Sequence, residues 1–126
     1  MTDGGYSEPT TLGLSLTGKA AAQRLIDEKV FLRQIDAYRF AIALGLAHGG
    51  YDTANLSRET MFNVGTLDPD GSLRTAVDLL RDALDEPVYR SAERYAEWGF
   101  REMNRVLSSG TIKFGIWLTE VAERQG

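Results

Sequence analysis

The chain has little of what builds redox, disulfide or metal sites. Its 126 residues include no cysteine and a single histidine, His48. Without cysteine it can form neither a disulfide framework nor a thiolate metal site. One histidine without patterned partners suits neither a nucleophilic triad nor a histidine-based metal centre. We therefore expect a non-enzymatic protein with no catalytic residue, no metal and no cofactor.

Long apolar runs are also missing. No stretch approaches the roughly 20 apolar residues that a membrane-spanning helix needs. Residues 1–9 are acidic and polar, and they contain neither the basic nor the apolar part of a signal peptide. We therefore predict a cytoplasmic protein without membrane contact. Residues 1–10 are predicted to form a mobile tail, and residues 11–126 a single domain.

Positive charge is scarce in the chain as a whole. The formal net charge is −4 at pH 7. This balance disfavours a general nucleic-acid binder, because nonspecific affinity comes largely from Lys and Arg side chains that neutralise phosphates. The charge is uneven, since the range from Lys19 to Arg39 has five basic and three acidic residues. An acidic protein of this kind can still present one mildly basic face.

What the chain does contain is apolar periodicity, which predicts a mainly α fold. Alternation over Leu12–Thr17 predicts a short strand, with Leu12, Leu14 and Leu16 on its buried face. For Thr60–Val64 the sequence allows two alternatives, a short strand or an irregular segment. Thr17 and Asp36 are predicted as N-caps of the first two helices. Helical periodicity then predicts helices over Gly18–Glu28, Asp36–His48, Ser72–Leu84, Pro87–Leu107 and Thr111–Arg124.

The start of the chain is a strand–helix–helix unit over residues 11–48. Its single strand must pair with a strand of another chain or with one elsewhere in the same chain. The unit resembles the ribbon-helix-helix superfamily, and the residues that carry the resemblance are Leu12-Gly-Leu-Ser-Leu16, Ala21, Leu25-Ile26 and the run from Ile35 to Leu44. The expected fold is this unit followed by about three packed helices, with the helical remainder over residues 59–126.

The ribbon-helix-helix resemblance implies DNA binding by a homo-oligomer, a dimer or higher. Strands of two chains would pair, and the outer strand face, with Thr11 and Ser15, would read bases. Backbone amides near Gln34, helped by Arg33, would hold a phosphate at the start of the second helix. Oligomerisation would involve the strand and the second helix.

The same residues are similar, more narrowly, to the E component of bacterial DNA sulfur-modification (phosphorothioation) systems. This second resemblance rests on the run from Arg39 to Leu46. It implies oligomers, DNA contact through surface lysines such as Lys19, and partners among other proteins of a DNA-modification or defence complex. The expected role is then an accessory component of a modification or restriction system.

A second candidate DNA surface lies on the long helix predicted after Pro87. Arginines follow one another there at spacings of four, seven and four residues, which places them near one helix face. Acidic residues are interleaved within ion-pair reach, so a solvated, ion-paired face is the alternative. A protein–protein adaptor on the same fold, without DNA binding, is the alternative function. The candidate arginines are Arg90, Arg94, Arg101 and Arg105.

Overall fold

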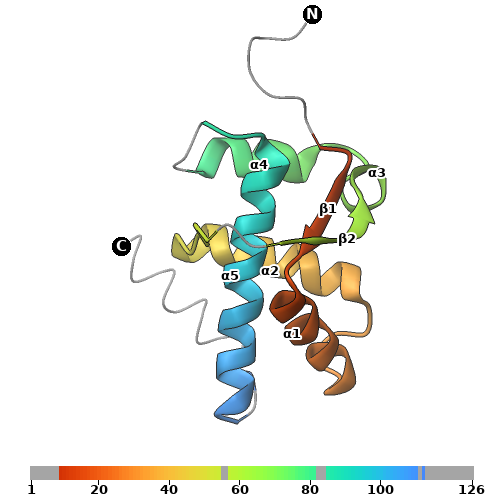
Figure 1. Cartoon of the computed structure of the whole chain (residues 1–126), viewed down its shortest axis with the longest axis vertical. Helices are drawn as coiled ribbons and strands as arrows, with labels where there is room; N and C mark the ends of the chain where they lie inside the picture. The colour runs from red at the N-terminus through yellow and green to blue at the C-terminus, as the bar shows by residue number, and fades with distance from the viewer. Residues whose placement is uncertain (1–8, 55–56, 82–84, 111, 113–126) are drawn as a thin grey trace, which may run out of the picture.

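The computed structural model describes residues 9–54, 57–81, 85–110 and 112. They form a mainly helical fold with one small antiparallel sheet near the N-terminus (Figure 1). The predicted mainly helical chain with a strand–helix–helix start is therefore confirmed at this level. No helix in the described ranges combines the length and apolar character needed to cross a membrane. The elements are β1 (Thr11–Leu14), α1 (Leu16–Asp27), α2 (Gln34–His48), β2 (Glu59–Asn63), α3 (Val64–Leu67), α4 (Ser72–Leu80) and α5 (Val88–Ser108).

The centre of the core is the contact between α2 and α5, which is the most extensive contact between elements. Helix α5 runs the length of the molecule, and α2 crosses it (Figure 1). A Cβ on Gly99 would lie 2.2 Å from the carbonyl oxygen of Ala41, so the two helix backbones approach more closely than a side chain would permit. Tyr38 of α2 and Phe100 of α5 are fully buried and meet edge to face, with ring centroids 5.9 Å apart.

The strand β1 finds its partner within the same chain. It pairs antiparallel with β2, from Thr11 opposite Asn63 to Leu14 opposite Glu59, with a bulge in the register after Leu12. The segment left open between strand and irregular structure is therefore a strand, and the predicted helical remainder begins with it. This pairing differs from the one between two chains that the ribbon-helix-helix resemblance implies.

The junction between β1 and α1 corrects the prediction for Leu16. The strand ends at Leu14, and Ser15 caps α1 by accepting a hydrogen bond from the Gly18 N–H at 3.0 Å. Because Ser15 caps the helix, α1 begins earlier than expected. From this point the side chains follow the helical repeat of 3.6 residues instead of the two-residue repeat of a strand. Leu16 is consequently the first helical residue and is 69% exposed, so its predicted place on a buried strand face was wrong. Thr17, the expected cap, lies inside the helix.

The other helix boundaries agree with prediction to within two residues, except at the C-terminus of α4. Helix α2 begins at Gln34, and Arg33 rather than Asp36 occupies its N-cap position. The same helix ends at His48 as predicted, because Gly49 takes the left-handed conformation (φ 64°) that glycine adopts without strain. Helix α4 ends at Leu80, earlier than predicted.

Two predicted segments lie outside the described residues. They are the tail, apart from residues 9 and 10, and the last helix over Thr111–Arg124, apart from Ile112.

Candidate binding groove along α5

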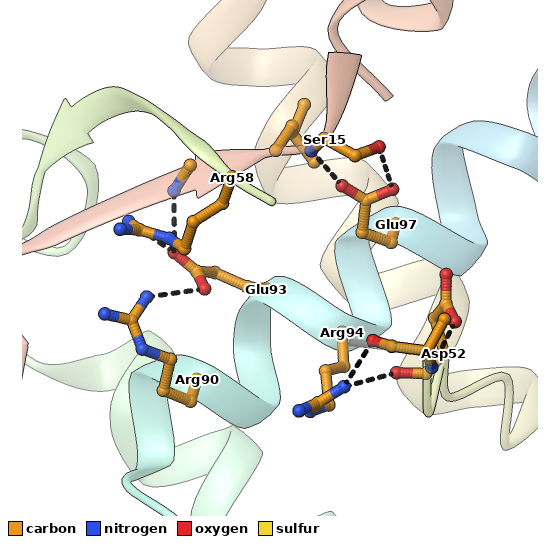
Figure 2. A pocket seen from close by; sticks show the side chains of 10 residues that line it. Ser15, Asp52, Arg58, Arg90, Glu93, Arg94 and Glu97 are labelled. Atoms are coloured by element: carbon orange, nitrogen blue, oxygen red, sulfur yellow. Dashed lines mark hydrogen bonds and ion pairs between the residues drawn. The ribbon is translucent and has the colours of Figure 1, made fainter. Parts of the chain in front are cut away.

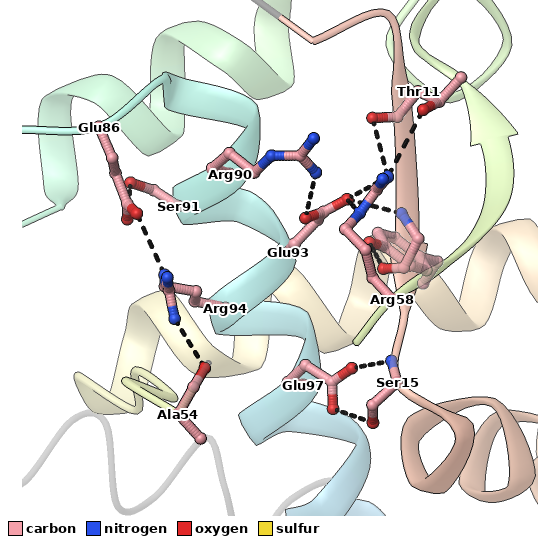
Figure 3. Close-up of polar contacts among 12 residues, drawn as sticks. Thr11, Ser15, Ala54, Arg58, Glu86, Arg90, Ser91, Glu93, Arg94 and Glu97 are labelled. Carbon is pink, nitrogen blue, oxygen red and sulfur yellow. Dashed lines mark hydrogen bonds and ion pairs between the residues drawn. The ribbon is translucent and has the colours of Figure 1, made fainter. Parts of the chain in front are cut away.

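The polar face of α5 reaches β1 and the N-cap of α1 through two carboxylates. Glu93 and Glu97 are four residues apart and so lie on the same helix face. Glu93 Oε2 accepts a hydrogen bond from the Gly13 N–H at 2.8 Å. Glu97 accepts hydrogen bonds from the Ser15 N–H and from the Ser15 hydroxyl, the latter at 3.0 Å (Figure 3). The Tyr38 hydroxyl donates to the Gly13 carbonyl at 2.7 Å, so a third strand cannot pair along this edge without displacing side chains.

Glu93 is the centre of a small ionic cluster. Its side chain is only 10% exposed, yet it accepts from Arg58 Nε at 2.7 Å and from Arg90 Nη1 at 2.7 Å. Arg58 directly precedes β2, so the cluster links α5 to both strands of the sheet. One carboxylate therefore balances two guanidinium groups, and the neighbourhood of Glu93 carries an excess positive charge.

Two further arginines of α5 fix the loop that follows α2. Arg94 Nε donates to Glu86 at 3.1 Å, and its Nη1 donates to the carbonyl oxygens of Asp52 and Ala54, both at 3.0 Å. Arg101 forms an ion pair with the carboxylate of Asp52, whose side chain is 9% exposed. The loop is thus tied to α5 by charge-assisted hydrogen bonds.

Between this loop, β1, α1 and α5 lie two cavities, of about 290 and 230 Å³. They share four lining residues and so lie next to one another. We call the two cavities together the α5 groove, and Figure 2 shows the first of them. The shared residues are Ser15, Asp52, Ala54 and Glu97. The first cavity adds Gly13, Leu14, Arg58, Arg90, Glu93 and Arg94, and the second adds Thr17, Gly18, Ala21, Arg101 and Asn104.

The α5 groove is lined by four arginines and three carboxylates, and its charges are separated in space. Arg58 and Arg90 share Glu93, which leaves positive charge at that end. Glu97 accepts only from neutral donors, both on Ser15, and pairs with no cation in the described part of the chain. The groove therefore has a cationic end and, one helical turn further along α5, a carboxylate without a counter-ion.

Three of the four candidate arginines on α5 line this groove, and the fourth does not. Arg90, Arg94 and Arg101 each bond a carboxylate within the chain. Arg105 lies beyond the groove and pairs with Glu102 at 2.7 Å. The sequence allowed an ion-paired helix face as the alternative to a DNA surface. Two ion pairs of this kind are present, Arg90–Glu93 and Arg105–Glu102, each between residues three positions apart.

The candidates on the strand face are not placed as base readers. Ser15 is buried, caps α1 and bonds Glu97, so it does not lie on an outer strand face. Thr11 is half-buried, and its hydroxyl lies 3.5 Å from Arg58 Nη2. The expected exposure of Ser15 was wrong because the chain turns into α1 at this residue.

The candidates at the helix starts form pairs of their own. Lys19 bonds Glu59 of β2 at 2.8 Å, and Gln34 donates to Gln23 at 2.9 Å. Arg33 donates two hydrogen bonds to Asp36, at 2.9 and 3.1 Å. Its hydrogen bonding and charge lower the pKa of Asp36, and Asp36 in turn raises the pKa of Arg33.

Sequence reasoning missed the partners that come from far along the chain. Arg58 and Asp52 carry no motif, and the pairing of Glu97 with Ser15 joins residues 82 positions apart. The only available signal was the spacing of acidic and basic residues along α5. Across the described ranges, no three or more His, Asp or Glu side chains gather as a metal site requires.

Comparison with protein-family models, curated proteins and solved structures yields no match to this chain. Both resemblances therefore stay predictions.

Proposed function

We propose that the chain is a non-enzymatic, cytoplasmic protein–protein adaptor that does not bind DNA as its main activity. One observation carries this proposal: every cation expected to contact DNA already pairs with a carboxylate of the same chain. These pairs are Lys19–Glu59, Arg33–Asp36, Arg90–Glu93, Arg94–Glu86, Arg101–Asp52 and Arg105–Glu102.

The pairing weakens DNA binding because a phosphate must compete with a carboxylate already in place. Nonspecific affinity depends on the release of counter-ions by unpaired Lys and Arg side chains. The net charge of −4 adds a long-range repulsion of the DNA backbone. Burial of Ser15 removes one of the expected base readers as well.

DNA association as part of a modification or restriction complex is the second candidate. The observation that favours it is the gathering of Arg58, Arg90 and Arg94 at one cavity. The expected homo-oligomer belongs to both candidates.

A titration separates the two. Fluorescence anisotropy with labelled duplex and single-stranded DNA, at low and moderate salt, should show no binding if the adaptor proposal is right. Salt-sensitive binding that falls in Lys19→Ala or Arg33→Ala, but not in the charge-matched control Lys29→Ala, would contradict it. Light scattering of the same samples gives the oligomeric state.

A capture experiment tests the adaptor role directly. The tagged full-length chain is incubated with lysate of its own cells after nuclease treatment, and retained proteins are quantified. The adaptor proposal expects a partner in defined stoichiometry that survives nuclease treatment. Retention that disappears with nuclease would instead favour DNA association.

A further inference from the structure

We propose that the α5 groove binds an extended segment of a partner protein that presents an acidic and a basic side chain two positions apart. The proposal rests on the adaptor function and names the chemistry of the partner. It follows from the dimensions of the groove, from its charge separation and from the character of its two cavities.

The length of the groove suits an extended polypeptide. Its lining on α5 runs from Arg90 to Asn104, and at about 1.5 Å per helical residue this is roughly 21 Å. An extended chain advances about 3.3 Å per residue, so about six residues match this length. The two cavities that form the groove adjoin one another, because they share four lining residues.

The cationic end is suited to a carboxylate. In the described part of the chain, Glu93 is the one carboxylate that Arg58 and Arg90 pair with, and a guanidinium has five N–H donors. Arg90 uses only Nη1 for Glu93, and its side chain is 36% exposed. A partner Asp or Glu can therefore accept hydrogen bonds from Arg90 without displacing Glu93.

Glu97 is suited to the basic side chain. It faces both cavities, and among the residues that the structure describes only the neutral donors of Ser15 form hydrogen bonds with it. The second cavity adds the small residues Gly18 and Ala21, against which the aliphatic part of a Lys side chain can pack. A cation placed here would give Glu97 the counter-ion that the described residues do not supply.

The spacing of the two charges follows from α5. The Arg90 guanidinium lies at the carboxylate of Glu93, and Glu97 is four residues, about 6 Å, further along the helix. In an extended segment, side chains on one face are two residues and about 6.6 Å apart. An acidic and a basic residue separated by one residue therefore match the two positions. A nucleic acid supplies only anions and would face Glu97 and Asp52.

A display experiment tests this match. A library of six-residue segments with randomised sequence is selected on the full-length chain, and we expect enrichment of acid–base pairs two positions apart over adjacent pairs. Arg90→Gln should abolish the acidic preference alone, and Glu97→Gln the basic preference alone. Arg105→Gln removes an arginine of the same helix outside the groove and should change neither.

The enriched segment, labelled with a fluorophore, provides an affinity measurement by anisotropy. We expect each groove variant to bind about tenfold more weakly, as loss of one charge-assisted contact implies, with circular dichroism unchanged. Absence of any charge pattern in the wild-type selection would overturn the inference, as would preferences that survive both substitutions. If the nuclease-resistant partner is retained equally by Arg90→Gln and Glu97→Gln, the adaptor function stands and the groove is not its site. Salt-sensitive DNA binding in the anisotropy titration would instead contradict the adaptor function itself.

Discussion

The two faces of α5 are stabilised by different kinds of interaction. The face toward α2 is apolar, and Ala92, Ala96, Phe100 and Met103 on it are fully buried. The face toward β1 is ionic, and Glu93 there bonds groups that are distant in sequence. Packing depends on the volume and periodicity of apolar residues, whereas the ionic face depends on specific partners. The first kind of face tolerates little change in size, and the second little change in charge.

The largest effect is expected from removing volume at the apolar face. Phe100→Ala should destabilise the protein by about 3–5 kcal/mol, because it leaves a cavity between α5 and α2 beside Tyr38. Urea denaturation followed by circular dichroism measures the loss. Leu32→Ala is the control, since Leu32 is 89% exposed and its loss should change stability by less than about 0.5 kcal/mol. Equal effects of the two substitutions would contradict the assigned core.

Adding volume at the same face should cost less. Gly99→Ala places a methyl group against the Ala41 carbonyl and must push α2 and α5 apart. Overpacking of this kind costs about 1–3 kcal/mol, although alanine regains about 1 kcal/mol of helix propensity over glycine. The matched control is Gly65→Ala in α3, where a Cβ meets nothing within 4 Å. A stabilised Gly99→Ala protein would show that the helices are not in close contact.

The sequence predicts the apolar face well and the ionic face poorly. The spacing of Ala92, Ala96 and Met103 in the sequence is that of an apolar helical stripe, and the structure buries all three. Periodicity predicts core residues because the apolar residues of one helix face are buried together, whichever element packs against that face. Ion pairs three residues apart, such as Arg90–Glu93, are equally local. The contacts of Glu93 with Gly13 and Arg58 depend on tertiary arrangement, and no local pattern encodes them.

A charge change at the ionic face tests the role of Glu93. Glu93→Gln keeps the size of the side chain but replaces one acceptor by an NH₂ donor that faces Arg58 or Arg90. We expect a loss of about 1–2 kcal/mol, reduced from the buried limit because both arginines are about one-third exposed. Glu59→Gln, which breaks the exposed pair with Lys19, is the control and should cost less than about 0.5 kcal/mol. The denaturation midpoints of the two variants are compared at equal m-values. An unchanged midpoint in Glu93→Gln would show that the cluster contributes no stability.

The smallest effect is expected at an ion pair of similar chemistry with more exposed side chains, 67% for Arg33 and 41% for Asp36. Hydrogen bonds from Arg33 lower the pKa of Asp36 from its ordinary value of 3.8. The deprotonated carboxylate is thus favoured in the folded state, and its stabilising contribution is present above pH 3.8 and lost as the pH falls through the lower folded pKa. Asp36→Asn should therefore shift the neutral-pH denaturation midpoint less than Glu93→Gln does.

The difference between wild type and Asp36→Asn should also vanish in acid, once the wild-type carboxyl is protonated in both states. Glu28→Gln is the comparison, because no ion pair to Glu28 is present among the described residues. A wild-type advantage over Asp36→Asn that persists below the folded pKa would show that Asp36 acts through packing or helix capping rather than through its charge. Solvent screening of the exposed Arg33–Asp36 pair explains why burial, more than the count of ion pairs, decides what a charge contributes to this fold.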